Sequence, residues 1–149
     1  MLKRIVFASG FLAAAILAAC SSSPAQPQVT LGNQVLNLEL AMTQAEQTQG
    51  LSGRNSLPRD EGMLFIYKTP GFYKIWMPNM HFSIDVLWIN SKGVVQHIER
   101  GMSPETYPRS FSSPHPSQYI LEVNAGVAGE VKVGDMVYFE NIPMLDDLV

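Results

Sequence analysis

Apolar and polar residues alternate near the start of the folded part of the chain. Between residues 35 and 41, three leucines alternate with more polar neighbours, which is typical of a half-buried strand. Thr43 comes next and is followed three residues later by Glu46, the capping-box pattern of a helix start. Gly50 is well placed to end that helix. The pattern therefore predicts a strand followed by a short helix.

Nearly continuous apolar runs follow at residues 62–67 and 84–89, the second with Asp85 inside it. Such runs are typical of strands that are covered on both faces. Residues 90–93 form a cluster of turn residues before another apolar segment at 94–99. We therefore expect a hairpin between these two segments.

Two further strands are expected at residues 119–123 and 136–139, with a helical turn over 125–130. Residues 101–117 hold four prolines and show no periodicity, so we expect a long loop that is either functional or flexible. At least six short strands and one or two small helices predict an α+β domain that is mainly β. Its antiparallel sheet should close into a small barrel-like core.

The N-terminal segment has a different pattern. Lys3 and Arg4 precede an apolar run that ends with small residues before Cys20. This is the layout of a secretory signal peptide, and the run of about 15 apolar residues falls short of the roughly 20 that a membrane span needs. The segment resembles a bacterial lipoprotein signal, with Leu17 three residues before the cysteine.

That resemblance implies cleavage before Cys20 and attachment of lipid, including a fatty acyl chain such as palmitate. Two acyl chains suffice for stable anchoring, so we expect a membrane to hold the mature protein. Ser21 stands where lipoproteins retained in the inner membrane commonly carry Asp, which implies the periplasmic face of the outer membrane. We expect residues 1–19 to be the signal peptide, 20–28 the lipidated cysteine and a flexible tether, and 29–149 the folded domain.

Composition narrows the function further. The chain has 149 residues, enough for one ordinary domain, and 46% apolar against 15% charged residues excludes disorder of the whole chain. Its formal charge of -3 argues against a nucleic-acid partner, because Lys and Arg dominate contacts with phosphate. Cys20 is the only cysteine, so no disulfide can form within the chain.

Several short motifs follow one another along the expected domain. They are GLSGR at 50–54, DEGMLF at 60–65, WMPNM at 76–80, YILEV at 119–123 and KVGD at 132–135. Their order and spacing across residues 35–141 resemble the DUF192 family. The resemblance implies a compact β-rich domain, often exported, and implies no particular reaction.

Six residues that match the family pattern are the candidates for ligand binding: Arg54, Glu61, Trp76, Asn79, Asp85 and Glu122. Arg54, Glu61 and Asp85 lie in or near apolar sequence, where an unpaired charge would be costly. We therefore expect Arg54 to pair with a buried carboxylate and to tie a loop to a strand. A polar ligand site and acid/base catalysis are the alternatives for these charges.

Trp76 is interpreted as a core or rim aromatic, or as a platform on which a sugar or another ring stacks, and Asn79 as a turn residue. The histidines are scattered and the one cysteine is assigned to lipid, so we predict no zinc site and no cofactor. A copper(I) site at Met77, Met80 and His81 is a less favoured possibility, since thioethers and imidazole suit that ion.

Two functional hypotheses remain. The favoured one is a non-enzymatic lipoprotein that binds a small envelope ligand or a protein partner. The competing one is a hydrolase-like envelope enzyme that uses Glu61 and Asp85 as a carboxylate pair. Such a pair needs both carboxyl groups about 5–10 Å apart around an open cleft, which a structure can test.

Overall fold

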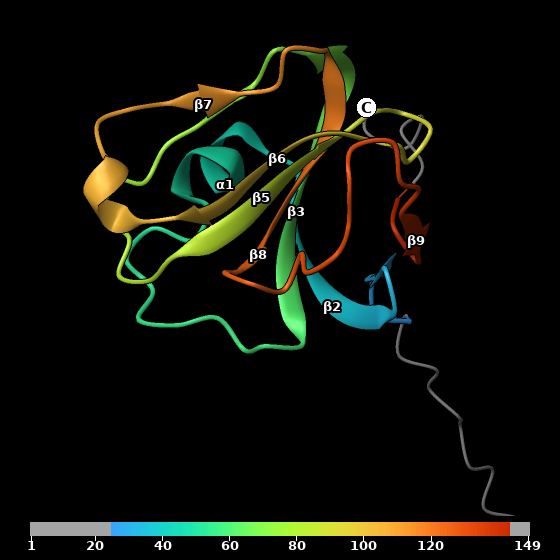
Figure 1. Ribbon diagram of the computed structural model, residues 1–149, viewed down its shortest axis with the longest axis horizontal. Coiled ribbons are helices and arrows are strands. Elements are labelled where there is room, and N and C mark those ends of the chain that lie inside the picture. The colour runs from blue at the N-terminus through green and yellow to red at the C-terminus, as the bar shows by residue number, and fades with distance from the viewer. Residues whose placement is uncertain (1–24, 144–149) are drawn as a thin grey trace, which may run out of the picture.

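Seven strands form one strongly curled sheet in the computed structural model, which describes residues 25–143 (Figure 1). In spatial order they are β6 (Val95–Met102), β5 (Ile84–Ile89), β8 (Ser117–Asn124), β3 (Glu61–Gly71), β2 (Gln34–Ala41), β1 (Gln28–Leu31) and β9 (Tyr138–Glu140). A second, two-stranded sheet pairs β4 (Lys74–Ile75) with β7 (Phe111–Ser112). The helices are α1 (Gln44–Gln49) and a 3-10 helix at Pro104–Thr106. The mainly β, α+β fold class expected from the sequence is confirmed.

The predicted capping box fixes the start of α1. The Thr43 hydroxyl accepts a hydrogen bond from the Glu46 N–H at 3.2 Å, and the Glu46 carboxylate accepts one from the Thr43 N–H at 2.8 Å. Gly50 ends the helix with φ of 48° and ψ of -134°, a backbone conformation that glycine adopts far more easily than other residues.

The sheet differs from the expected antiparallel arrangement at one place. β2 and β3 pair in parallel, with Leu38 opposite Gly62 and Leu40 opposite Leu64, while the other strand pairs are antiparallel. A parallel pair needs a crossover connection, and α1 with the loop after it supplies that connection. The helix is thereby held against β2, and the Gln47 side chain donates a hydrogen bond to the Ile66 carbonyl of β3.

Three further details differ from the expectations. β1, β4 and β7 were not predicted, because each is short. β4 and β7 also depend on each other across the chain, whereas β1 forms a hairpin with β2 through the turn at Gly32 and Asn33, a local signal that was missed. Residues 125–130 form turns rather than a helical turn. The proline-rich segment 101–117 holds the end of β6, the 3-10 helix and β7 instead of one irregular loop.

Each face of the sheet carries its own apolar core. The inner core fills the inside of the curl with residues from both ends of the sheet, among them Val29, Leu64, Leu87 and Val137. The outer core lies on the other face and is covered by α1 and the segments around β4 and β7; it includes Leu51, Phe65, Met77, Trp88 and Ile120. β5 is buried along its whole length, as its apolar run predicts.

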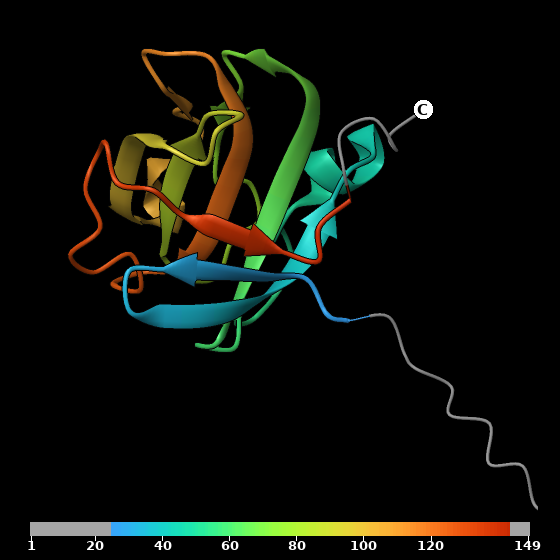
Figure 2. The ribbon, with the colours of Figure 1, turned by 90° about the vertical axis from the view of Figure 1, so that its right-hand side faces the viewer.

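The two edges of the sheet meet at one end of the curl. Val94, just before β6, forms a bridge with Met136, just before β9. Backbone hydrogen bonds from Val95 N–H to the Asp135 carbonyl at 2.9 Å and from Val137 N–H to the Gly93 carbonyl at 2.9 Å flank this bridge. Figure 2 shows β9 and β1 crossing in front of the rest of the sheet, which gives the domain the shape of a half-closed barrel.

The expected signal peptide and Cys20 lie outside the described residues. The first strand lies close to the expected boundary: β1 starts at Gln28, and the Pro27 carbonyl accepts a hydrogen bond from Leu38 N–H at 2.8 Å. Among residues 25–143, no helix has the length and apolar character to cross a membrane.

Candidate functional site

A pocket of about 220 Å³ opens on the outer face of the sheet, between α1, β3, β8 and the segment that contains β4. Its apolar wall includes Phe65, Met77 and Ile84, and its lining also contains Lys74 and the glutamines of α1. Trp76 belongs to the lining and is 54% exposed, which places it at the rim. The crossover between β2 and β3 thus forms one side of the pocket.

Glu122 is the only carboxyl group in the pocket lining. β8 directs it to the outer face, where its cross-strand neighbours are Met63 on β3 and Val86 on β5. Its side chain is 5% exposed, and no hydrogen bond reaches its carboxyl from residues 25–143. Burial raises the pKa of this carboxyl to about 8, although the positive charge of Arg54 acts in the opposite direction.

The end of α1 lies directly over Glu122. A methyl group added at Gly50 would lie 3.3 Å from Cζ of Phe65 and 3.9 Å from Oε2 of Glu122. Glycine therefore lets the helix end approach both side chains closely, in addition to providing the positive φ. Gly50 is the first residue of the GLSGR motif. Its close approach to Glu122 brings this motif and β8 together in one site.

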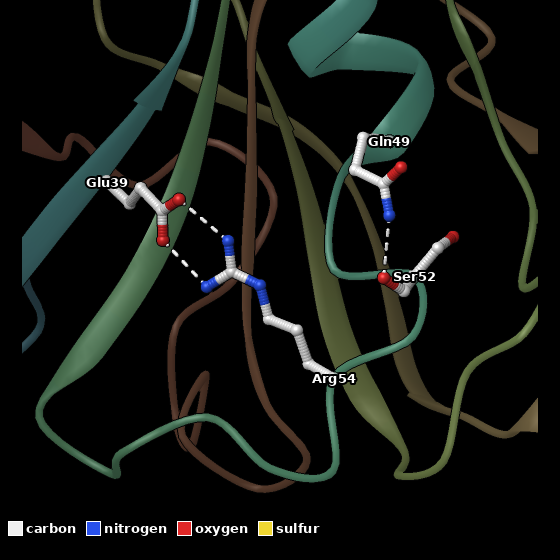
Figure 3. A network of polar contacts seen from close by, with 4 residues as sticks. All are labelled: Glu39, Gln49, Ser52 and Arg54. Atoms are coloured by element: carbon white, nitrogen blue, oxygen red, sulfur yellow. Dashed lines mark hydrogen bonds and ion pairs between the residues drawn. The ribbon is translucent and has the colours of Figure 1, made fainter.

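Side chains on the helical wall use their donors inside the protein. Gln47 Nε2 donates to the Ala41 and Ile66 carbonyls, Thr48 Oγ1 to the Gln44 carbonyl, Gln49 Nε2 to the Ser52 carbonyl, and Ser52 Oγ to the Pro78 carbonyl. Figure 3 shows the bond from Gln49 to Ser52 at 2.8 Å. These four side chains therefore use donors inside the protein and can offer oxygen acceptors to a ligand, whereas the Gln44 amide makes no such bond among the described residues.

Tyr67 is a pocket residue that the sequence reasoning did not identify. Its ring stacks on Tyr73, with the ring centroids 3.4 Å apart and the planes inclined by 8°. Burial raises the pKa of the Tyr67 hydroxyl, and the nearby negative charges of Glu122 and Tyr73 raise it further. An aromatic residue at the end of a strand run resembles any core residue, so nothing in the sequence distinguished it.

Arg54 does not pair with a buried carboxylate as expected. Figure 3 shows its guanidinium in a two-pronged ion pair with Glu39 on β2, with both N–O distances 2.7 Å. The side chains of Arg54 and Glu39 are 35% and 51% exposed. The hydrogen bonds from Arg54 lower the pKa of Glu39. The pair does tie the loop after α1 to a strand, but at the surface.

Asp85 faces the inner core, on the opposite side of the sheet from Glu122. It is 1% exposed, and its carboxylate accepts hydrogen bonds from the N–H groups of Gly101 at 2.8 Å, Gly126 at 2.8 Å and Ala128 at 3.0 Å. Backbone amides rather than Arg54 therefore compensate this buried charge. Asp85 therefore has a structural role.

The proposed catalytic pair does not form one cleft. Glu61 begins β3 on the face opposite that of Asp85, half-buried, and neither residue lines the pocket. Asn79 adopts φ of 51° in the turn after Pro78, and its carbonyl accepts a hydrogen bond from Gly53 N–H at 2.8 Å. Of the six candidates, the structure places Trp76 and Glu122 in the pocket.

The residues of the possible copper site separate. Met77 and Met80 are buried in the outer core and line the pocket, whereas His81 is exposed and lies outside the lining. Within residues 25–143, no three His, Cys, Asp or Glu side chains gather as a metal site. The thioethers therefore act as pocket wall.

Comparison with solved structures shows that this architecture occurs elsewhere. A proposed transcription regulator from Sinorhizobium meliloti 1021 is 28% identical, with a TM-score of 0.71 over 78% of this chain and 94% of its own. A protein of unknown function from Novosphingobium aromaticivorans DSM 12444 is 29% identical, with a TM-score of 0.70 over 85% of this chain and 99% of its own. No curated protein matches the chain.

The motifs of the pocket also belong to a defined family pattern. The family model of DUF192, described as "Uncharacterized ACR", matches residues 27–139, which include every strand of the curled sheet except the last residue of β9. Gly50 and Glu122, which meet at the floor of the pocket, both lie within that match. The chain therefore belongs to the DUF192 family.

Proposed function

We propose that this protein is a lipid-anchored binding protein of the outer membrane, facing the periplasm, whose DUF192 domain holds a small ligand in the Glu122 pocket. The observation that carries the proposal is the buried carboxyl of Glu122, which lines the pocket and accepts no hydrogen bond from the described residues. A ligand that enters the pocket can supply the hydrogen bond that this carboxyl does not receive from the described residues.

The dimensions of the site favour a small molecule over a protein partner. The pocket has a volume of about 220 Å³ and ends at a side chain that is 5% exposed, so a partner protein could reach it only with a narrow projection. Trp76 at the rim adds an exposed aromatic surface over which one end of a ligand can lie. Pockets of this kind combine apolar walls with a few polar groups that orient the ligand.

The signal-like sequence ending at Cys20 supports the anchoring part of the proposal. The described domain starts within ten residues of this cysteine, because Gln28 already belongs to β1. Lipid on Cys20 would therefore hold the pocket close to the membrane surface.

Ligand-observed NMR with a library of small amines, alcohols, amides and carboxylates tests the binding function. We expect hits for the full-length protein in nonionic detergent that weaken at least about tenfold in Glu122→Gln and in Trp76→Ala. Glu140→Gln is the control, because Glu140 is exposed on β9 and lies outside the pocket. Hits that bind both pocket variants unchanged, or a library without hits, would overturn the proposal.

A further inference from the structure

We infer that the ligand of the pocket is a small organic ammonium ion, whose charge the Glu122 carboxylate neutralises and whose apolar part packs near Trp76. This inference rests on the proposed binding function. It follows from the supply of donors and acceptors in the pocket, from the position of Glu122, and from the aromatic residues of the lining.

Several side-chain donors on the helical wall are already used inside the protein. Both hydrogen-bonding partners of the Gln47 amide nitrogen are backbone carbonyls, at 3.3 Å and 2.9 Å, and the hydroxyl groups of Thr48 and Ser52 also donate to carbonyls. The Gly50 N–H is occupied by the Glu46 carbonyl at 2.7 Å. A ligand that meets this wall is complementary when it donates hydrogen bonds, as an ammonium group does.

No cation of the described residues forms an ion pair with Glu122. The charge of Arg54 acts on Glu122, but both prongs of Arg54 bind Glu39 at 2.7 Å, and Arg54 lies outside the pocket lining. Lys74 is the cation in the lining and is solvent-exposed on β4. Across the sheet, Glu122 faces apolar Met63 and Val86. A ligand cation would give this carboxylate the charge-assisted hydrogen bonds that the protein does not provide.

Aromatic rings also line the pocket. Phe65, Tyr67 and Trp76 all border the pocket, and an ammonium group is attracted to the faces of such rings. Anionic ligands are disfavoured at pH values at which Glu122 is ionised, because its charge would repel them. A neutral alcohol could also hydrogen-bond to Glu122, so the experiment must separate these two classes of ligand.

Benzylamine and benzyl alcohol are suitable probes, because they share one ring and differ in the charge of one group. Binding to the full-length protein in nonionic detergent can be followed through the change in tryptophan fluorescence. Trp76 lines the pocket and should respond, whereas the emission of Trp88 should change little, because Trp88 is fully buried and lies outside the lining. Binding of the ammonium ion requires Glu122 to lose its proton, so its affinity should rise roughly tenfold per pH unit from about pH 5.5 to 7.5. The alcohol should show no such rise.

Two variants complete the test. Glu122→Gln keeps the shape of the side chain and should remove both the preference for benzylamine, at least about tenfold at pH 7.5, and the pH dependence. Glu140→Gln should keep both. Equal binding of the two probes, or tighter binding of the alcohol, would overturn the ammonium inference while the binding function stands. Binding of neither probe at any pH would overturn the inference and count against the function as well.

Discussion

Burial raises the pKa of the Glu122 carboxyl to about 8, whereas the ordinary pKa of Glu is 4.5. Between these pH values the folded protein holds a proton that the unfolded chain has released. The free energy of unfolding must therefore decrease as the pH rises through this window, by up to about 1.4 kcal/mol per pH unit. Below about pH 4.5 both states are protonated and this contribution is constant.

Glu122→Gln should remove this pH dependence, because the amide does not titrate. We expect the melting temperature of the parent protein to fall between about pH 5 and 8, and that of the variant to stay nearly level and to lie higher at pH 8. Thermal melts at several pH values provide the measurement, with Glu140→Gln as the control. If the melting temperatures of the parent and of Glu122→Gln declined in parallel, the group that holds the proton would be a residue other than Glu122.

Arg54→Ala should cost little stability, in contrast to the buried pair that the sequence suggested. The pair with Glu39 has two-pronged geometry, but both side chains are more than a third exposed, at 35% for Arg54 and 51% for Glu39. Pairs of this kind contribute about 0–1 kcal/mol, so we expect a melting temperature within a few degrees of the parent value. A loss of several kcal/mol in a denaturant titration would contradict this interpretation.

At the scale of elements, Asp85 joins β5 to two other segments. Its carboxylate binds Gly101 N–H near the end of β6 and the N–H groups of Gly126 and Ala128 in the turns after β8. Asp85→Asn replaces one acceptor oxygen by a donor that would face backbone N–H groups. We expect a loss of about 2–4 kcal/mol in the free energy of unfolding, measured by urea denaturation.

Asp135→Asn is the matched control for this prediction. Asp135 is exposed, and its side chain accepts one backbone hydrogen bond, from Lys132 N–H at 2.8 Å. Its substitution should therefore cost less than about 1 kcal/mol. Equal losses in the two variants would mean that burial of the Asp85 hydrogen bonds adds nothing.

The elements that the sequence predicts correctly are those with a local cause. The capping box of Thr43 and Glu46 and the apolar run of β5 need no distant partner to be identified. β4 and the parallel pairing of β2 with β3 depend on contacts between segments that are separated along the chain, so no local pattern carries them. β1 is different, because it forms a hairpin with β2 across Gly32 and Asn33, and that local turn was overlooked. The helical turn expected at 125–130 failed because Asp85 organises that segment as turns.

The site was predictable only in part for the same reason. Glu122 was named from its motif, but its position beneath Gly50 results from the crossover that places α1 over the outer face. Glu39, the partner of Arg54, looks like any polar position of an alternating strand. It shares the outer face with Met63, which lies between it and Glu122 across the strands, and this register is visible only in the folded sheet.

At the scale of the whole molecule, the anchor can be tested separately from the pocket. Cys20→Ser should abolish incorporation of a fatty-acid probe and release the protein from the outer-membrane fraction, because its thiol is the proposed site of lipid attachment. Metabolic labelling followed by density-gradient separation of membranes measures both effects. Ser21→Ala should keep the label, and label persisting on Cys20→Ser would refute the lipoprotein assignment.

If the proposed lipid anchor holds the protein on a membrane, the bridge between Val94 and Met136 affects how its molecules meet at high density. A sheet with two open edges can add a strand from a neighbouring molecule, and confinement to a surface brings neighbours close together. Next to the bridge, the Val137 N–H donates a hydrogen bond to the Gly93 carbonyl. These two edge groups are therefore not free to pair with another strand. The domain can therefore be held at high surface density with less of its edge backbone open to strand exchange.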